Sequence, residues 1–207
     1  MDITRVDPSL RTATKRAPQL KIENRVVLAI IANLTKFIPG SRTDGVERRV
    51  IRDGDVRVRV FIPSSPTGAG LLWIHGGGLV LGAAAMSDQF CGETARDTGT
   101  TIVSVEYRVA PKHPFPAALD DVHAGWRWML QHAAELGLDA TRLAVGGQSA
   151  GGGRAAYAER LTAAGVEVSF RPVHGAAHGF EAWDSDSAIA RSLLADARGW
   201  LGERLAG

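Results

Sequence analysis

The chain has 207 residues, of which 45% are hydrophobic and 22% are charged. This composition is typical of one folded domain and is too apolar for a disordered protein. The longest apolar run, residues 26–32, is far shorter than the roughly 20 residues that cross a bilayer, so no membrane partner is expected. The single cysteine, Cys91, excludes an internal disulfide and a cysteine metal cluster.

The charge of the chain is nearly balanced, with a formal net charge of +2. Lys and Arg outnumber Asp and Glu by 13 to 7 in residues 1–60, but they are scattered rather than clustered. Because no nucleic-acid-binding motif accompanies them, we expect no nucleic-acid partner. The first residues lack the basic and apolar regions of a signal peptide, and we therefore expect a cytoplasmic protein.

The first 40 residues have a helical pattern. Apolar residues recur at helical spacing between Ile22 and Ile38, and Pro39-Gly40 ends the run. We expect residues 1–40 to form a short helical cap segment and residues 41–207 to form the main domain. The sequence favours neither a lid over a pocket nor a simply packed helix for this segment.

Strand and helix patterns alternate in the rest of the chain. Residues 46–51 and 56–62 predict a hairpin around Asp53-Gly54. Continuous apolar runs predict strands that are buried on both faces, at residues 71–74, 102–105 and 143–145. A last strand is expected at residues 166–170, and helices are expected at 87–97, 116–136, 150–164 and 186–205. The order predicts an α/β fold: a mostly parallel sheet with helices on both faces, preceded by an antiparallel hairpin.

A G-x-S-x-G motif, Gly147-Gln148-Ser149-Ala150-Gly151, lies between a predicted strand and a predicted helix. In that context the serine sits on a sharp turn that exposes its Oγ above the sheet, while the flanking glycines relieve crowding. The following helix N-terminus directs backbone N–H groups at developing negative charge. Ser149 is therefore a candidate nucleophile; the alternative is a glycine-rich turn with an incidental serine.

A second glycine motif, His75-Gly76-Gly77-Gly78, directly follows the strand at residues 71–74. It is of the type that forms the oxyanion loop of lipases and esterases. A flexible turn is the alternative, and a Walker-type phosphate loop is excluded because no Gly-Lys-Ser/Thr follows.

His178 follows the last predicted strand, in the chain order that a catalytic base requires in α/β-hydrolases. His174 lies four residues earlier, but the intervening Gly175 and the loop context argue against a helical zinc pair. We therefore expect no metal at this position.

Four segments resemble the hormone-sensitive lipase family of α/β-hydrolases, which are the bacterial family IV carboxylesterases: residues 75–78, 107–121, 147–153 and 178–180. The resemblance implies an α/β-hydrolase fold, Ser149 as nucleophile and His178 as base, with no cofactor. By position it also implies an oxyanion hole made by the N–H groups of Gly77, Gly78 and Ala150. Residues 1–40 match the cap of the family, and residues 107–121 are expected to brace the oxyanion loop.

The chain departs from the family between the motif serine and the histidine. Two to three βα units are absent there, and the usual catalytic aspartate is absent with them. Glu181, Asp184 and Asp186 follow the histidine closely and are candidate substitutes, although an ordinary loop and helix N-cap would also explain them. The sequence thus predicts a reduced α/β-hydrolase domain.

These observations predict a serine carboxylesterase that hydrolyses small-molecule esters with short acyl chains. The alternative is a non-catalytic ligand-binding protein on a degenerate hydrolase scaffold, which the missing acid favours and the retained motifs disfavour. We also expect a homodimer, because the shortening leaves the strand at residues 166–170 near a sheet edge that a second copy can pair with.

Overall fold

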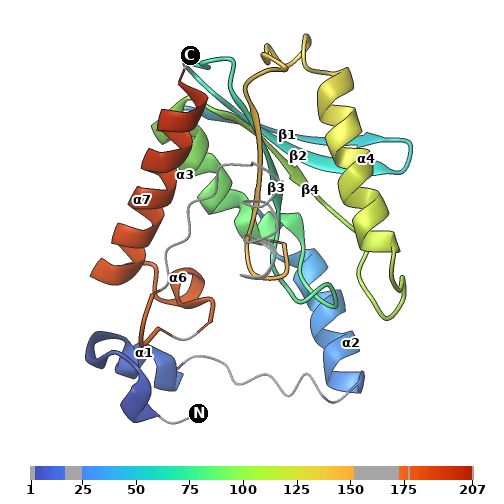
Figure 1. Ribbon diagram of the computed structural model, residues 1–207. Helices are drawn as coiled ribbons and strands as arrows, with labels where there is room; N and C mark the ends of the chain where they lie inside the picture. Colours follow the sequence, from blue (N-terminus) through green and yellow to red (C-terminus); the bar gives the residue numbers. More distant parts are fainter. Residues whose placement is uncertain (1–2, 17–24, 152–172, 177, 207) are drawn as a thin grey trace, which may run out of the picture.

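The computed structural model describes residues 3–16, 25–151, 173–176 and 178–206 (Figure 1). The described strands form one five-stranded sheet in the order β1-β2-β4-β3-β5. Their bounds are β1 Val46–Asp53, β2 Val56–Pro63, β3 Gly70–Ile74, β4 Thr101–Val105 and β5 Leu143–Gly147. The predicted helix at residues 150–164 and the predicted strand at 166–170 lie almost wholly outside the described residues.

The sheet joins an antiparallel hairpin to three parallel strands, as the sequence predicts. Asp53 pairs with Val56 across the hairpin turn, and β2 then pairs antiparallel with β4. Strands β4, β3 and β5 are parallel, and Ile74 pairs with both Val105 and Gly147. The segments that follow β3 and β5 therefore leave the sheet side by side, which brings the two glycine motifs together.

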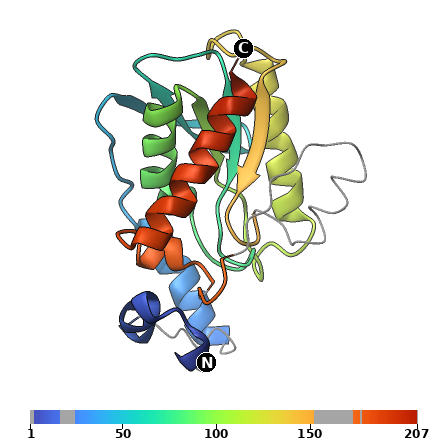
Figure 2. The same cartoon turned by 60° about the vertical axis from the view of Figure 1, so that its left-hand side comes forward.

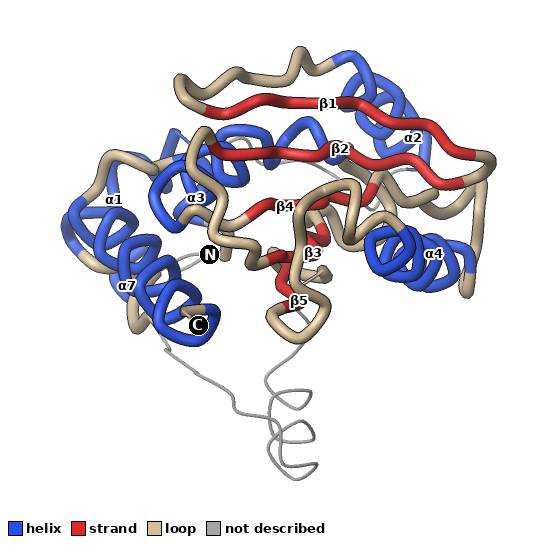
Figure 3. The backbone as a smooth tube through the Cα atoms, turned by 90° about the horizontal axis from the view of Figure 1, so that it is seen from above, coloured by secondary structure: helices blue, strands red, loops and turns tan. Residues whose placement is uncertain are grey.

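Helices cover both faces of the sheet (Figure 3). Helices α3 (Asp88–Thr98) and α7 (Ala188–Leu205) lie on one face, where Figure 2 shows α7 crossing the sheet, and α4 (Ala117–Gln131) lies on the other. Successive strand residues point to opposite faces, so Leu71 packs with Cys91 and Leu201 while Leu72 packs with Met129. This explains why β3 and β4 are apolar without alternation. The prediction that residues 143–145 are buried on both faces is wrong, because Val145 in β5 is 58% exposed.

The N-terminal segment is not the single helical run that the sequence suggests. The turns η1 (Ile3–Arg5) and η2 (Pro8–Leu10) lead into α1 (Arg11–Arg16), and α2 (Arg25–Leu34) continues into η3 (Thr35–Phe37). Residues of the first part pack against α6 (Phe180–Trp183) and α7. In the described ranges, no helix is both long and apolar enough to cross a membrane.

Other elements also differ from the sequence prediction. Helix α4 ends at Gln131 rather than at residue 136, because His132 leaves the helical backbone region and its ring stacks on Trp128. Ala133 and Leu136 remain buried in the turns that follow, so the apolar spacing continues without a helix. The short elements η4 (Ala84–Ser87) and α6 are not predicted by the sequence, and α7 begins after Ser187, whose side chain accepts from the Ala190 N–H.

Candidate active site

Ser149 lies on the turn after β5 with a φ of 55°, in the left-handed region that residues other than glycine seldom adopt. The Gln148 N–H donates to the Ile74 carbonyl at 3.0 Å, and the Gly151 N–H donates to the Gln148 carbonyl at 2.8 Å. These bonds tie the turn to the end of β3 and maintain the backbone strain at the serine. The sharp turn that the G-x-S-x-G motif predicts is confirmed.

The two glycines of the motif are required by close backbone contacts. A Cβ atom at Gly147 would lie 2.5 Å from the carbonyl carbon of Gly151, and one at Gly151 would overlap the carbonyl oxygen of Ile74. Neither neighbour is a flexible side chain that can give way. A side chain at either position would therefore move Ser149 relative to the end of β3.

His178 is the only described side chain within hydrogen-bonding distance of the Ser149 hydroxyl. Its Nε2 atom lies 2.6 Å from Ser149 Oγ, a distance suited to proton transfer between the two groups. Ser149 is half-buried and His178 is exposed, so solvent reaches the pair directly. The structure thus brings together two residues that the sequence places 29 positions apart.

The N-terminal segment holds the loop that carries His178. The Asp7 N–H donates to the Gly175 carbonyl at 2.7 Å. Phe180, two residues after the histidine, is buried with Val6 and Leu10. The position of His178 therefore depends on residues that lie more than 160 positions earlier in the chain, a contact that no local pattern signals.

The loop after β3 presents free backbone donors next to the serine turn. Gly77 and Gly78 have φ values of 125° and 65°, and a Cβ at Gly77 would overlap the carbonyl of Leu81. Among the residues that the structure describes, the N–H groups of Gly77, Gly78 and Ala150 donate no hydrogen bond. Such N–H groups are available to a ligand oxygen that carries negative charge.

Residues 107–110, which follow β4, hold the loop after β3 by hydrogen bonds. Tyr107 donates its hydroxyl hydrogen to the His75 carbonyl at 2.9 Å, and its ring stacks on the His75 imidazole with the centroids 4.0 Å apart. The Ala110 N–H donates to the Leu79 carbonyl at 3.0 Å. The Arg108 guanidinium makes a bidentate ion pair with the Asp121 carboxylate on α4. The bracing role expected of residues 107–121 is confirmed.

Glu181, Asp184 and Asp186 make no hydrogen bond to His178 in the described parts of the chain. Within the described parts of the chain, no carboxylate lies within hydrogen-bonding distance of the imidazole. Glu181 instead accepts a hydrogen bond from the Gln148 side chain at 2.8 Å. Sequence reasoning did not single out Gln148, although a polar residue directly before the motif serine was a visible signal.

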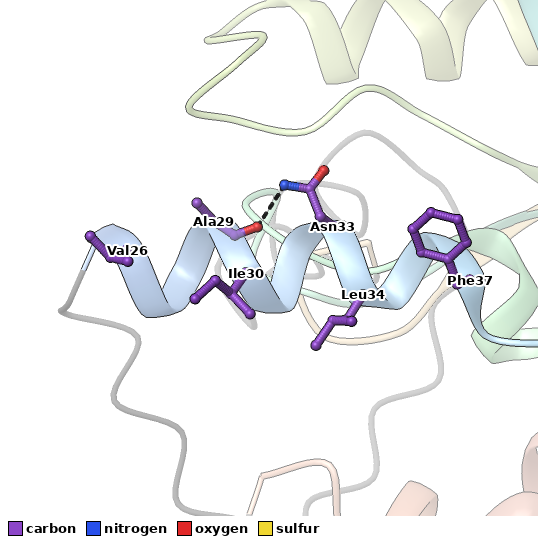
Figure 4. A pocket seen from close by; sticks show the side chains of 6 residues that line it. All are labelled: Val26, Ala29, Ile30, Asn33, Leu34 and Phe37. Carbon is purple, nitrogen blue, oxygen red and sulfur yellow. Dashed lines mark hydrogen bonds between the residues drawn. The ribbon is translucent and has the colours of Figure 1, made fainter.

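An open apolar hollow lies on the N-terminal part of the molecule, along α2 (Figure 4). Its lining side chains are Val26, Ala29, Ile30, Asn33, Leu34 and Phe37. None of them belongs to the loops that carry Ser149, His178 or Gly77. The described residues also contain no cluster of three or more side chains suited to binding a metal ion.

Comparison with known proteins gives one family match. Residues 71–156 match a family model described as the alpha/beta hydrolase fold. The chain is 42% identical over 123 residues to the ethyl acetate hydrolase of Pseudomonas putida, covering 57% of this chain and 39% of that protein. It is also 42% identical over 122 residues to the carboxylesterase NlhH of Mycobacterium tuberculosis, covering 56% and 37%.

Several solved structures with similar folds are named esterases. A bacterial heroin esterase superposes with a TM-score of 0.65 at 38% identity, covering 80% of this chain and 56% of that one. The esterase LipW of Mycobacterium marinum gives a TM-score of 0.82 at 21% identity, covering 100% and 98%, which supports the fold alone. The matches to the ethyl acetate hydrolase and to NlhH each span less than two fifths of the length of those curated relatives.

Proposed function

We propose that the chain is a serine carboxylesterase of the α/β-hydrolase fold that acts on small esters with short acyl chains, as the match of residues 71–156 to that family model supports. The observation that carries the proposal is the 2.6 Å contact between Ser149 Oγ and His178 Nε2, made by a serine held at positive φ. The relatives that are named ester hydrolases support the same chemistry.

The proposed reaction has two halves. Ser149 Oγ attacks the ester carbonyl carbon while His178 Nε2 takes the hydroxyl proton. The N–H groups of Gly77, Gly78 and Ala150 stabilise the oxyanion, and His178 returns the proton to the leaving alcohol. A water molecule then gives a proton to His178 and attacks the acyl carbonyl carbon. The bond from this carbon to Ser149 Oγ breaks, His178 returns the proton to Oγ, and the carboxylic acid is released. Neither half requires a cofactor.

The rate is expected to be modest, since no described carboxylate stabilises the imidazolium. In serine proteases, replacing the acid lowers kcat by a factor on the order of 10⁴, while the oxyanion hole and the remaining dyad retain measurable catalysis. Solvent reaches the exposed His178 and stabilises its charge in part. Esters of good leaving alcohols, which need little proton donation, are therefore the best substrates.

We further propose a preference for acyl chains of about two to six carbons, because burying a longer chain requires an enclosed apolar cavity beside the nucleophile. The described apolar hollow lies along α2, and its lining residues are not those of the Ser149 turn. Residues 1–40 are proposed to act as the cap segment and residues 41–207 as the hydrolase domain. A cytoplasmic location is proposed on the single free cysteine.

Hydrolysis of p-nitrophenyl acetate, butyrate and octanoate by the purified protein tests the proposed activity. We expect turnover of the acetate and butyrate esters, slower turnover of the octanoate, and a loss on the order of 10³-fold or more in Ser149→Ala. Ser64→Ala, at an exposed serine outside the site, is the matched control and should keep wild-type rates.

Two results would contradict the proposal. Ser149→Ala activity within a few-fold of wild type would eliminate this serine as the nucleophile. Saturable ester binding by the wild type with no hydrolysis would favour the ligand-binding alternative.

We also propose a homodimer. The strand at residues 166–170, from which the sequence argument starts, lies outside the described residues. Support comes instead from large apolar side chains that are exposed on one face of α2 and η3: Ile30 at 54%, Leu34 at 61% and Phe37 at 81%. A second copy could cover this face about a two-fold axis.

Light scattering behind size exclusion at micromolar concentration tests the dimer. We expect twice the mass of one chain for the wild type and a shift towards one chain in Leu34→Ser with Phe37→Ser. A fully active wild-type protein at the mass of a single chain would contradict the proposal.

A further inference from the structure

The Gln148 side chain lies between the two loops that flank Ser149. Its Nε2 donates to Glu181 Oε1 at 2.8 Å, on the segment that carries His178. On its other side, a Cβ built at Gly76 would lie 3.1 Å from Gln148 Oε1, so the carboxamide packs against the oxyanion loop. One half-buried side chain therefore contacts both loops.

Both ends of the Gln148–Glu181 bond are anchored in the fold. The backbone N–H of Gln148 is bound to the Ile74 carbonyl at 3.0 Å, which fixes this end to the sheet. Glu181 lies in the first turn of α6, directly after Phe180, whose side chain is 4% exposed. Because neither end is a mobile surface group, the bond connects two fixed parts of the structure.

Two bonds connect the same pair of segments. Ser149 Oγ meets His178 Nε2 at 2.6 Å, and Gln148 meets Glu181 at 2.8 Å. A single contact between two segments allows one to pivot about it, whereas two adjacent contacts fix their relative orientation. The second bond is charge-assisted, because a carboxylate accepts it, and such bonds are stronger than neutral ones.

We propose that Gln148 and Glu181 are a positioning pair that holds the His178 imidazole against Ser149. The inference rests on the proposed esterase function and assigns the pair no contact with substrate. A catalytic acid normally orients the imidazole by binding it directly. Here the pair orients it indirectly, through the position of the segment that carries His178, and Glu181 makes no described hydrogen bond to the imidazole. Its loss should therefore lower kcat and leave KM nearly unchanged, because misplacing a reacting group affects the chemical step.

The test is a set of variants assayed on p-nitrophenyl acetate at pH 8. Gln148→Ala and Glu181→Ala are each expected to lower kcat about 10- to 100-fold with little change in KM. The double alanine variant should lose no more than the worse single variant, because either change breaks the same bond. Glu203→Ala, at an exposed carboxylate on α7, is the control and should keep the wild-type kcat.

Conservative and swapped variants separate a positioning role from a general effect on stability. Glu181→Gln should lose only about threefold, since its carboxamide oxygen still accepts the bond. Gln148→Glu places two carboxylates together and should lose as much as Gln148→Ala. Combining Gln148→Glu with Glu181→Gln reverses donor and acceptor and should restore most of the lost kcat.

Nitrogen NMR of the His178 ring provides a measurement that is independent of turnover. The Nε2 signal should show its hydrogen bond in the wild type, Glu181→Gln and the swapped variant, and lose it in both alanine variants. If the wild type hydrolyses no ester but this pattern holds, the proposed function fails and the pair stands. An unchanged Nε2 signal in the alanine variants, kcat within about twofold of wild type, or no recovery in the swapped variant would overturn the inference.

Discussion

At the scale of single residues, burial disfavours the charged form of His75, the histidine that opens the glycine loop after β3. His75 is 1% exposed, and burial lowers the pKa of its imidazole to about 4. Its Nδ1 lies 2.7 Å from the Gly76 carbonyl, so Nδ1 carries the hydrogen and donates it. Among the described residues its Nε2 has no hydrogen-bond partner, so they offer no acceptor for a second proton.

This environment predicts a pH dependence of stability. Since the folded pKa of His75 lies below the value of about 6.5 for an unfolded chain, protonation favours the unfolded state. The stabilising contribution is complete above about pH 6.5 and is lost as the pH falls towards 4, by roughly 3 kcal/mol. Urea unfolding at pH 7 and pH 4.5 measures the loss.

The unfolding experiment needs a residue-specific measurement beside it, because Glu106 changes the free energy of unfolding with pH in the direction opposite to His75. Burial raises the pKa of its carboxyl group, so its contribution decreases as the pH rises through that pKa. An NMR titration of the His75 ring isolates the histidine. The imidazole should stay neutral down to about pH 4; titration near pH 6.5 in the folded protein would contradict the account.

At the scale of elements, the loop after β3 depends on the segment after β4. The Tyr107 hydroxyl is the donor that satisfies the buried His75 carbonyl. Tyr107→Phe keeps the stacked ring and removes only this donor. We expect a loss of about 1–3 kcal/mol in the free energy of unfolding and a lower kcat. Unfolding curves and ester kinetics measure both effects; wild-type stability in Tyr107→Phe would show that the bond is unimportant.

The elements also show what local sequence patterns can predict. Strand β3 and the hairpin follow their patterns because apolar runs, alternation and Gly54 act on neighbouring residues. The end of α4 does not, because the backbone leaves the helical region at His132 while Leu136 keeps its buried position in the following turns. Local patterns also do not predict that the first residues form the separate turns η1 and η2, because η2 packs on residues near the other end of the chain.

At the scale of the whole molecule, the candidate site assembles from three segments that the fold brings to one place. The glycine motifs could be found in the sequence because their backbone requirements are local. The contact of Ser149 with His178 could be inferred only from chain order and resemblance. The bond from Gln148 to Glu181 could not be inferred, because it depends on where Phe180 packs against Val6 and Leu10.

Covalent labelling of the serine tests the central claim most directly. Treating the protein with a p-nitrophenyl alkylphosphonate should release one p-nitrophenolate per chain and add one phosphonyl group, which tandem mass spectrometry should locate on Ser149. Ser149→Ala should take up no label, and His178→Ala should take it up more slowly. A wild-type protein that stays unlabelled, or carries the group on another residue, would contradict the assignment of Ser149 as the nucleophile.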